Sequence, residues 1–388
     1  MAADREVLRE RLHALGFDVV RFARVDGDSP GADAFERWLD SGHQADMAWM
    51  ERSRAKRRDV TQVQAGATTL VMLGVNYAPA PAVGAAAVPA EDGGGTGVWA
   101  RYALHDDYHD SIKPGLVAAG QVLEQWGGIS GADYRYYVDT GPVLERSWAA
   151  RAGVGFTGKN AMLISREFGN WLFLAAIVVG GGILIEPDAP VSRAAADRPV
   201  GTLCGSCTAC LEACPTQALV APGELDARRC ISYHTIENRG IIPRAMRRGI
   251  GDRLYGCDIC AEVCPWNRFA QASKSLLLNR RPELAALSLE EILTLTPERF
   301  AAVFKGTAVK RLKLRGLLRN ACIVAANTGA LACRPALWRL AAESEWAMVR
   351  AHAVAALREL GATLDELAAL RGRETDAAVL AEFGEPTP

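Results

Sequence analysis

Cysteine residues with the spacing of iron–sulfur ligands are concentrated in one segment of the chain. The first run is that of bacterial ferredoxins and reads Cys204-x2-Cys207-x2-Cys210-x3-Cys214-Pro215. The second run is one cysteine short and reads Cys257-x2-Cys260-x3-Cys264-Pro265. Leu254 occupies the position of the missing ligand, and Cys230, between the runs, can supply it. Eight cysteines then complete two four-cysteine sites, which predicts two 4Fe–4S clusters and one-electron transfer.

The spacing also predicts which cysteines share a cluster, because the fourth cysteine of such a run binds the other cluster of a pair. The first cluster is expected to be held by Cys204, Cys207, Cys210 and Cys264. The second is expected to be held by Cys214, Cys230, Cys257 and Cys260. Disulfides are disfavoured because no secretory signal is visible, and zinc prefers paired Cys-x2-Cys units. Cys322 and Cys333 lie in Ala/Leu-rich helical context and are expected to be buried as small hydrophobic residues.

Length, charge and hydropathy limit the class of protein. A chain of 388 residues suggests two or three domains, and the net charge of -1 argues against a globally basic nucleic-acid binder. The most apolar stretch, Trp171 to Ile185, is too short for a membrane span and is interrupted by three glycines. We therefore expect a soluble, cytoplasmic protein without a membrane partner.

Hydrophobic spacing predicts three domains. Residues 5–15 are typical of a helix, residues 17–25, 69–77 and 134–138 of strands, and residues 161–165 and 171–179 of a hairpin. These elements predict a mixed α/β domain over 1–190, followed by a ferredoxin-like domain over 191–275. Residues 276–388 are helical and carry a weak 31-residue repeat, which indicates HEAT-like repeats, with a plain helical bundle as the alternative. The predicted fold class is α+β.

Polar residues near the predicted strand ends are candidates for catalysis. Asp139 follows the strand at 134–138, where it can cap an Asx-turn or act as a general acid whose pKa burial raises. Asp107, Tyr108 and His109 gather three proton-donating groups in adjacent positions. The segment Gly158-Lys159-Asn160 can bind phosphate or form a turn, since its spacing is not that of a P-loop.

The order and spacing of these motifs resemble the epoxyqueuosine reductases, a family of cobalamin-dependent, iron–sulfur enzymes of tRNA modification. The matching segments, which extend over about residues 1–270, are Ala100-Arg101-Tyr102-Ala103, Asp107-Tyr108-His109, Val138-Asp139-Thr140-Gly141-Pro142-Val143-Leu144-Glu145-Arg146, Gly158-Lys159-Asn160, Cys204 to Pro215, Arg229-Cys230-Ile231-Ser232-Tyr233, Tyr255-Gly256-Cys257 and Cys264-Pro265-Trp266-Asn267-Arg268. The helical C-terminal segment is similar to a HEAT-like extension found in some members.

The resemblance implies a reaction and a site. Two 4Fe–4S clusters would supply electrons to a cobalamin in the N-terminal domain, and epoxyqueuosine at the tRNA wobble position would be reduced to queuosine. Asp139 matches the family's proton donor, and the same pocket would be lined by Asp107, Tyr108, His109 and Arg146. Contacts to cobalamin are expected from Arg57, Arg101, Asp139, Lys159 and Asn160.

The resemblance also gives a role to a basic run in the helical segment. Its members expected to dock the tRNA through phosphates are Lys310, Arg311, Lys313, Arg315 and Arg319; an ordinary solvated helix face is the alternative. The expected electron donor is a flavodoxin or ferredoxin system, and the expected state is a monomer. Two rival functions stay open: a reductive dehalogenase-like corrinoid enzyme, and a ferredoxin-type electron carrier without catalysis.

Overall fold

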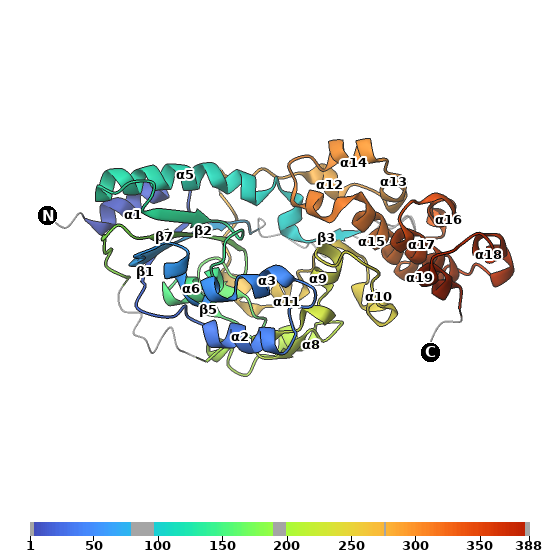
Figure 1. The fold of residues 1–388 in the computed structure, drawn as a ribbon, viewed down its shortest axis with the longest axis horizontal. Helices are drawn as coiled ribbons and strands as arrows, with labels where there is room; N and C mark the ends of the chain where they lie inside the picture. Colours follow the sequence, from blue (N-terminus) through green and yellow to red (C-terminus); the bar gives the residue numbers. More distant parts are fainter. Residues whose placement is uncertain (1–3, 79–96, 189–198, 275–276, 385–388) are drawn as a thin grey trace. The chain divides into compact units, whose positions relative to one another are not determined.

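The computed structural model describes residues 4–78, 97–188, 199–274 and 277–384 (Figure 1). The chain forms two compact units, each assembled from separated segments. The first joins the described parts of residues 1–83, 107–228 and 259–279, and the second joins those of 84–106, 229–258 and 280–388. The cysteine-rich region contributes to both units. The predicted division into three consecutive domains stays a prediction.

A four-stranded antiparallel sheet is the framework of the first unit. Its order is β1 (Val19–Arg24), β2 (Thr69–Asn76), β7 (Leu172–Val179) and β4 (Tyr134–Tyr137). Helices α1 (Arg5–His13) and α5 (Tyr108–Gly127) lie together on one side of the sheet, and α6 (Glu145–Arg151) packs against the other (Figure 1). Because both faces are covered, every residue of β2 is buried, which explains its continuous apolar sequence. The α+β prediction is confirmed.

The predicted hairpin of residues 161–165 and 171–179 is wrong. Strand β6 (Leu163–Ser165) pairs instead with β5 (Gly155–Thr157), and β7 lies between β2 and β4 in the main sheet. Gly155 permits the tight pairing, because a Cβ there would lie 2.2 Å from the carbonyl oxygen of Ile164. Sequence proximity favoured a hairpin, but β7 buries more apolar surface at the centre of the sheet.

Short elements surround the sheet in the first unit. The helices are α2 (Ala32–Asp40), α3 (Ala48–Arg52), α4 (Arg54–Arg58), α8 (Ala209–Glu212) and α11 (Ile259–Glu262). Strands β8 (Leu219–Ala221) and β9 (Glu224–Leu225) form a small hairpin after the first cysteine run. A 3-10 helix, Pro265–Phe269, follows the second cysteine run directly.

Helices predominate in the second unit. A short parallel pair, β3 (Val98–Trp99) and β10 (Arg253–Tyr255), accompanies α9 (Ile231–Ile236) and α10 (Arg244–Ile250). The C-terminal helices are α12 (Pro282–Ala285), α13 (Leu289–Leu293), α14 (Pro297–Val303), α15 (Lys313–Asn327), α16 (Arg334–Glu343), α17 (Ala347–Glu359), α18 (Leu364–Arg371) and α19 (Ala377–Leu380).

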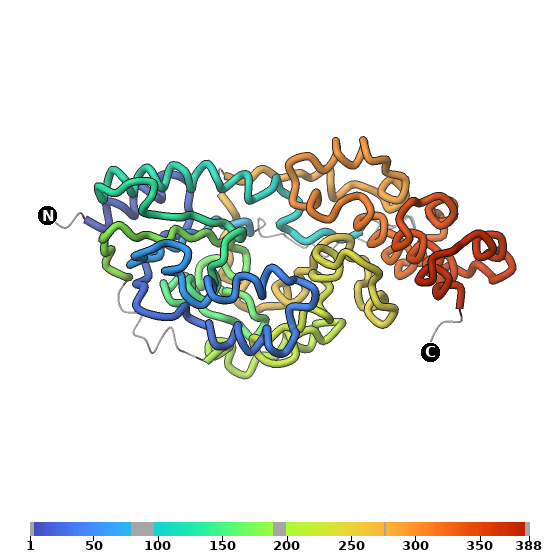
Figure 2. The backbone as a smooth tube through the Cα atoms, in the orientation of Figure 1, coloured from blue at the N-terminus to red at the C-terminus, as the bar shows by residue number. Residues whose placement is uncertain are grey.

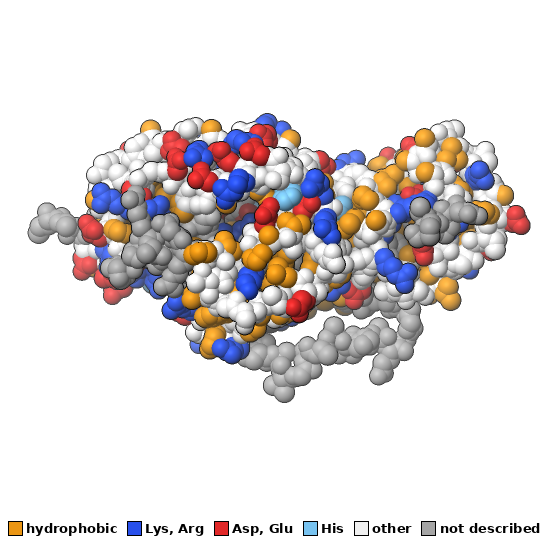
Figure 3. Space-filling view, turned by 90° about the horizontal axis from the view of Figure 1, so that it is seen from below, with side chains coloured by type: hydrophobic (Ala, Val, Ile, Leu, Met, Phe, Trp, Pro, Cys, Tyr) orange, Lys and Arg blue, Asp and Glu red, His pale blue; other side chains and the backbone are white. Residues whose placement is uncertain are grey.

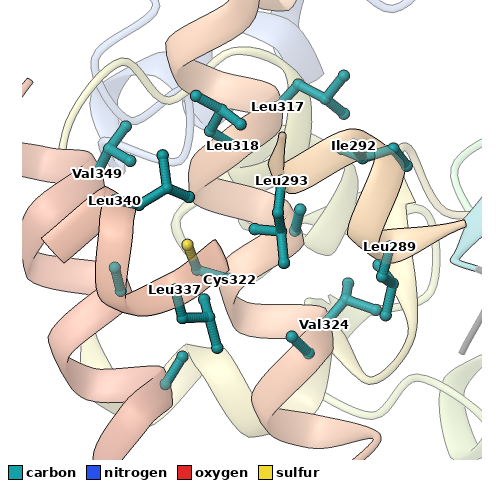
Figure 4. Close-up of a cluster of buried hydrophobic side chains, with 14 of the residues drawn as sticks. Leu289, Ile292, Leu293, Leu317, Leu318, Cys322, Val324, Leu337, Leu340 and Val349 are labelled. Carbon is teal, nitrogen blue, oxygen red and sulfur yellow. The ribbon is translucent and has the colours of Figure 1, made fainter. Parts of the chain in front are cut away.

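The core of the second unit surrounds helix α15. Helices α15, α16 and α17 fold back on one another (Figure 2), and α15 also packs against α13 and β10. Side chains from α13, α15, α16 and α17 meet in one apolar cluster, in which Leu317, Cys322 and Leu337 are fully buried (Figure 4). Cys322 and Cys333 are both buried, as predicted from their helical context. The assignment of these helices to HEAT-like repeats stays a prediction.

Hydropathy gives no sign of a membrane span within the described residues. None of their helices combines the length and the apolar composition that crossing a bilayer requires.

Candidate active site and iron–sulfur ligand site

The N-terminus of helix α5 fixes the Asp107-Tyr108-His109 segment. Asp107 is the N-cap, and its Oδ1 accepts a hydrogen bond of 3.0 Å from the main-chain amide of His109. The same oxygen lies 2.7 Å from Nδ1 of His109. One carboxylate therefore both begins the helix and orients the imidazole, which satisfies an otherwise unpaired amide of the first turn.

Stacked rings hold the side chain of Tyr108. Its ring centroid lies 4.0 Å from that of His109 and 4.4 Å from that of Phe173, with interplanar angles of 29° and 12°. Tyr77 continues the stack at 4.4 Å from Phe173. Tyr77 follows the last residue of β2 and Phe173 lies near the start of β7, so the central strands of the sheet support the Tyr108 phenol. The sequence alone did not indicate a role for either aromatic residue, because both lie among apolar neighbours in predicted strands, a pattern that is typical of residues in a hydrophobic core.

Asp139 follows strand β4 and faces solvent beside Tyr108. The Tyr108 hydroxyl donates a hydrogen bond of 2.7 Å to Oδ2 of Asp139. Asp139 has a φ of +54°, in the left-handed region that few residues other than glycine adopt. Aspartate tolerates this conformation better than most residues, although it still costs free energy. The structure thus brings together Asp107, Tyr108, His109 and Asp139, which sequence reasoning placed in one pocket.

Arg57 holds the loop that carries Asp139. Its guanidinium donates to the carbonyl oxygen of Val143 at 3.0 Å and to that of Gly141 at 3.3 Å, while Nε donates to Ser53 at 2.9 Å. Arg57 is 8% exposed, and burial lowers the pKa of its guanidinium. Three of its N–H groups fix Ser53 and the backbone of residues 141–143, and the predicted contact of Arg57 with cobalamin stays a prediction.

Two residues at the start of α6 complete this loop. Arg146 is exposed, and its guanidinium donates to the carbonyl oxygen of Ala161 at 2.7 Å. Glu145 has a buried Oε1 that lacks a hydrogen-bond partner among the described residues. Burial, and then the negative charge of Asp139, raise the pKa of Glu145 to about 7. Sequence reasoning did not select Glu145, because a glutamate at a helix start normally reads as a helix-dipole residue.

Four cysteines line one apolar cavity in the first unit. The cavity has a volume of about 80 Å³ and is bounded by Cys204, Cys207, Cys210 and Cys264, together with Ile164, Pro265 and Trp266. Burial, and then the neighbouring thiols, raise the pKa of Cys210. This is the ligand set predicted for the first cluster, and an apolar, four-thiol cavity suits the chemistry of a cubane.

The described residues contain no group of three or more His, Cys, Asp or Glu side chains that could hold a metal ion. The ligands of a 4Fe–4S cubane are arranged differently from those of a single metal ion, because each thiolate binds a separate iron atom of the cluster.

Lys159 and Asn160 lie at this cysteine cavity. The Lys159 ammonium donates to the carbonyl oxygens of Gly205 and Cys207 at 2.8 and 3.0 Å. Asn160 is 2% exposed, and its amide donates to Oδ1 of Asn170 at 2.9 Å and to the carbonyl oxygen of Cys260 at 3.2 Å. The Asn160 amide therefore connects the loop that carries Cys260 to Asn170. The predicted contacts of Lys159 and Asn160 with cobalamin stay predictions.

The second predicted ligand set draws on both units. Cys214 and Cys260 belong to the first, whereas Cys230 and Cys257 belong to the second. Arg101, an expected cobalamin contact, also belongs to the second unit, where its main-chain amide donates to Asp258 at 2.6 Å. The assembly of the second set and the role of Arg101 stay predictions.

The predicted tRNA-binding residues divide into an exposed group and one buried member. Lys310, Arg311, Lys313 and Arg315 are exposed, and Arg311 pairs with Glu237 at 2.7 Å. Arg319 is 0% exposed and donates to the carbonyl oxygens of His234, Asn238 and Gly240. The prediction is therefore wrong for Arg319, which lies on the core side of α15. On the face shown in Figure 3, basic side chains form several separate groups among acidic and apolar ones.

Two family models match the chain at the places where the site residues lie. Residues 57–140 match the model described as "Epoxyqueuosine reductase QueG, DUF1730", and residues 203–267 match "4Fe-4S double cluster binding domain". Among curated relatives, the epoxyqueuosine reductase of Vibrio cholerae is 37% identical over 313 residues, which cover 81% of this chain and 80% of the relative. That of Synechocystis is 40% identical over 75% of this chain and 93% of the relative.

The chain belongs to the epoxyqueuosine reductase family. It is an oxidoreductase of queuosine modification in tRNA, with a double 4Fe–4S cluster domain.

Solved structures of the family share this fold over almost the whole chain. A crystal structure of an epoxyqueuosine reductase with an epoxyqueuosine-modified tRNA-Tyr stem loop matches with a TM-score of 0.85 and 29% identity, and covers 98% of this chain and 96% of that one. A Bacillus subtilis enzyme, in which the catalytic aspartate loop is swung out of the active site, matches with a TM-score of 0.84 and 28% identity over the same shares.

Proposed function

We propose that this chain reduces the epoxide of epoxyqueuosine at the tRNA wobble position, with Asp139 as the acid that protonates the epoxide oxygen. The observation that carries the proposal is the hydrogen bond between Tyr108 and Oδ2 of the exposed Asp139. That bond occupies one carboxyl oxygen and fixes the rotamer, so Oδ1 is left to hold a proton toward a substrate. An alkoxide is a poor leaving group, and the reaction therefore needs a donor at this oxygen.

The Asp139 loop is built to keep this acid in one position. Arg57 donates hydrogen bonds to the carbonyl oxygens of Gly141 and Val143, and the stacked ring of Phe173 holds Tyr108. A positioned general acid contributes about 10²–10⁴-fold to rate, and misplacement by about 1 Å loses much of that gain. In the Bacillus subtilis enzyme a catalytic aspartate loop is swung out of the active site, so a mobile loop that needs a clamp is consistent with the proposal.

Cobalamin is the proposed redox cofactor of this site, and the residues of the first unit fit it. A corrinoid presents amide side chains and a phosphate-bearing tail, which need hydrogen-bond donors and a cation near the reacting face. The second nitrogen of the His109 imidazole and the remaining N–H groups of the exposed Arg146 guanidinium would supply such groups. When bound, cobalamin supplies the two-electron reducing power that no side chain can provide.

Electrons are proposed to enter through the cysteine-bound clusters. The first cluster would occupy the cavity of Cys204, Cys207, Cys210 and Cys264, and the second would use Cys214, Cys230, Cys257 and Cys260. Lys159 places a positive charge beside the first of these loops, which favours the more negative, reduced state of a cluster. A flavodoxin or ferredoxin system is the proposed external donor.

The substrate is proposed to be a tRNA anticodon stem loop, as in the family structure that contains one. Exposed Lys310, Arg311, Lys313 and Arg315 would contact phosphates, and these contacts would position the RNA without reading its bases.

Replacing the acid tests the proposal. In the reconstituted holoenzyme, Asp139→Asn should lower single-turnover reduction of an epoxyqueuosine stem loop by about 10²–10⁴-fold, because the amide cannot donate an acidic proton. Asp110→Asn, an exposed residue in the first turn of α5, is the matched control and should retain the parental rate. Nucleoside analysis of the digested RNA measures queuosine formed. Retained turnover in Asp139→Asn would remove the acid role.

Metal analysis of the anaerobically purified and reconstituted protein tests the cofactor assignment. We expect about eight iron atoms and about one cobalt per chain. Iron without cobalt, even after incubation with cobalamin, would favour an electron carrier over the proposed reductase.

A further inference from the structure

Glu145 stands at the opposite end of the catalytic loop from Asp139 and has no assigned role. Its Oε1 is buried without a hydrogen-bond partner among the described residues, although a buried carboxyl oxygen normally has one. The guanidinium of Arg57 lies within electrostatic range but donates to carbonyls of the loop and to Ser53. A buried carboxyl with one unpaired oxygen is costly when ionised, so a purely structural residue at this place would gain from a further partner or from replacement.

The proposed reaction needs two protons at one atom. Converting an epoxide to an alkene and water consumes two electrons and two protons, and both protons are added to the same oxygen. The first breaks the ring as an alcohol forms, and the second lets that oxygen leave as water. Asp139 holds one proton at a time, so it must be protonated again between the two transfers.

We propose that Glu145 is the second proton store of this site and returns a proton to Asp139 within each turnover. The inference rests on the acid role of Asp139 proposed above. In this step the O–H bond of Glu145 breaks and an O–H bond forms on the Asp139 carboxylate, either directly or through water. Glu145 is left as a carboxylate and Asp139 as an acid. No electron moves in the step, and solvent protonates Glu145 again after product leaves.

The charges that face Glu145 suit this exchange. Burial and the Asp139 carboxylate oppose ionisation, whereas Arg57, Arg146 and the main-chain amide of Glu145 favour it. With a pKa raised to about 7, Glu145 is largely protonated below neutral pH, while its proton remains transferable. A glutamate whose only role was a favourable interaction with the N-terminus of the α6 dipole would be stabilised in its ionised form, which would lower its pKa. The positive charges of Arg57 and Arg146 stabilise the Glu145 carboxylate after its proton has been transferred.

The pH dependence of single turnover tests the proposal in the reduced holoenzyme. Glu145 must be protonated to act, so the rate of the parent should fall as pH rises through about 7. The Glu145→Gln side chain has nearly the same shape but cannot transfer a carboxyl proton. The variant should no longer show the decrease in rate near pH 7, and its rate at pH 6 should be about 10- to 100-fold lower than that of the parent. Glu167→Gln, an exposed glutamate between β6 and β7, is the matched control and should keep the parental profile. Binding of the stem loop should be unchanged in both.

A spectroscopic titration tests the pair without turnover. Infrared difference spectra of the holoenzyme should show a protonated carboxyl that titrates near pH 7 and is absent in Glu145→Gln. Asp139→Asn should move this titration to lower pH, because the like charge is removed.

The outcomes distinguish the role proposed for Glu145 from the proposed reductase function and the acid role of Asp139. A parental rate and pH profile in Glu145→Gln would overturn the proton store and leave Asp139 as the acid. Loss of stem-loop binding in that variant, or a carboxyl titration unaffected by Asp139→Asn, would also overturn it and indicate a structural glutamate. Failure of the parent to reduce epoxyqueuosine would instead remove the function itself.

Discussion

Each unit of this chain contains a buried arginine whose guanidinium binds backbone carbonyls, but the two sites are built differently. Arg57 in the first unit donates to Gly141 and Val143 within electrostatic range of the carboxylates Asp139 and Glu145. Arg319 in the second unit donates to His234, Asn238 and Gly240, and the groups that act on its pKa include Arg239, Tyr233 and Arg315, none of which is a carboxylate. Burial lowers the pKa of Arg319 to about 9, so it stays charged at neutral pH.

The difference leads us to expect that the same residue type serves stability in one unit and, on the proposed function, positions a catalytic residue in the other. Arg319 has 0% exposure, and its five donor contacts to carbonyls and to Asn320 connect α15 with the segment after α9. Arg57 clamps a single loop that carries an exposed functional carboxylate in a strained conformation. We therefore expect replacement of Arg319 to lower the free energy of unfolding, and replacement of Arg57 to lower kcat.

The largest stability effect is expected for Arg319→Met. The substitution removes the donor from two buried carbonyls and one partly buried carbonyl, and each buried one left unpaired costs about 1–3 kcal/mol, while removal of a buried charge offsets part of the loss. We expect the free energy of unfolding to fall by roughly 3 kcal/mol, measured by urea denaturation of the holoprotein. Arg315→Met, an exposed residue one turn earlier on α15, is the control and should be close to the parent.

A direct role of Arg319 in RNA binding would reverse this result. In that case Arg319→Met would weaken stem-loop binding while the urea midpoint stayed at the parental value, and the comparison of the two arginines would be wrong.

A smaller effect, confined to turnover, is expected for Arg57→Met. Methionine retains an apolar stem near Trp49 and Phe35, whose rings lie 5.6 and 5.9 Å from the guanidinium carbon, but it frees the carbonyls at 141 and 143. We expect kcat to fall by about 10- to 100-fold through misplacement of Asp139, with unchanged stem-loop affinity. Arg58→Met is the control, because Arg58 is partly exposed and pairs with Asp28, Asp33 and Glu36 rather than with the carbonyls of the loop. Equal kcat in the Arg57 and Arg58 variants would show that the clamp does not position the acid.

The sequence predicted those parts of the molecule that local patterns encode. The cysteine spacing placed Cys204, Cys207, Cys210 and Cys264 around one cavity, and the apolar runs located β1, β2 and β4 to within two residues. The grouping of Tyr108 with Asp139 depended on family resemblance, because the two residues are 31 positions apart in the chain. No local pattern encodes that hydrogen bond.

The errors share a physical cause, which is that burial depends on packing between distant segments. Arg319 ends a basic run and looked exposed, but α15 is covered on all sides from Gly316 to Ala325. Asn160 and Arg57 are buried for the same reason, because each donates to a carbonyl from a segment far along the chain; their predicted contacts with cobalamin stay predictions. The role suggested for Glu145 was hidden too, because its orphaned oxygen exists only once the loop has folded.

The smallest effect is expected for the exposed basic residues that remain after Arg319 is excluded. Reversing Lys310, Lys313 and Arg315 to glutamate should raise KM for the stem loop by about tenfold or more at low salt, because phosphate contacts are replaced by repulsion. The effect should shrink as salt is raised, since counterion release drives such binding. Turnover at saturating RNA should stay near parental, because none of the three belongs to the unit that contains Asp139. A large loss of kcat at saturation would contradict a docking role and would extend catalysis into the second unit.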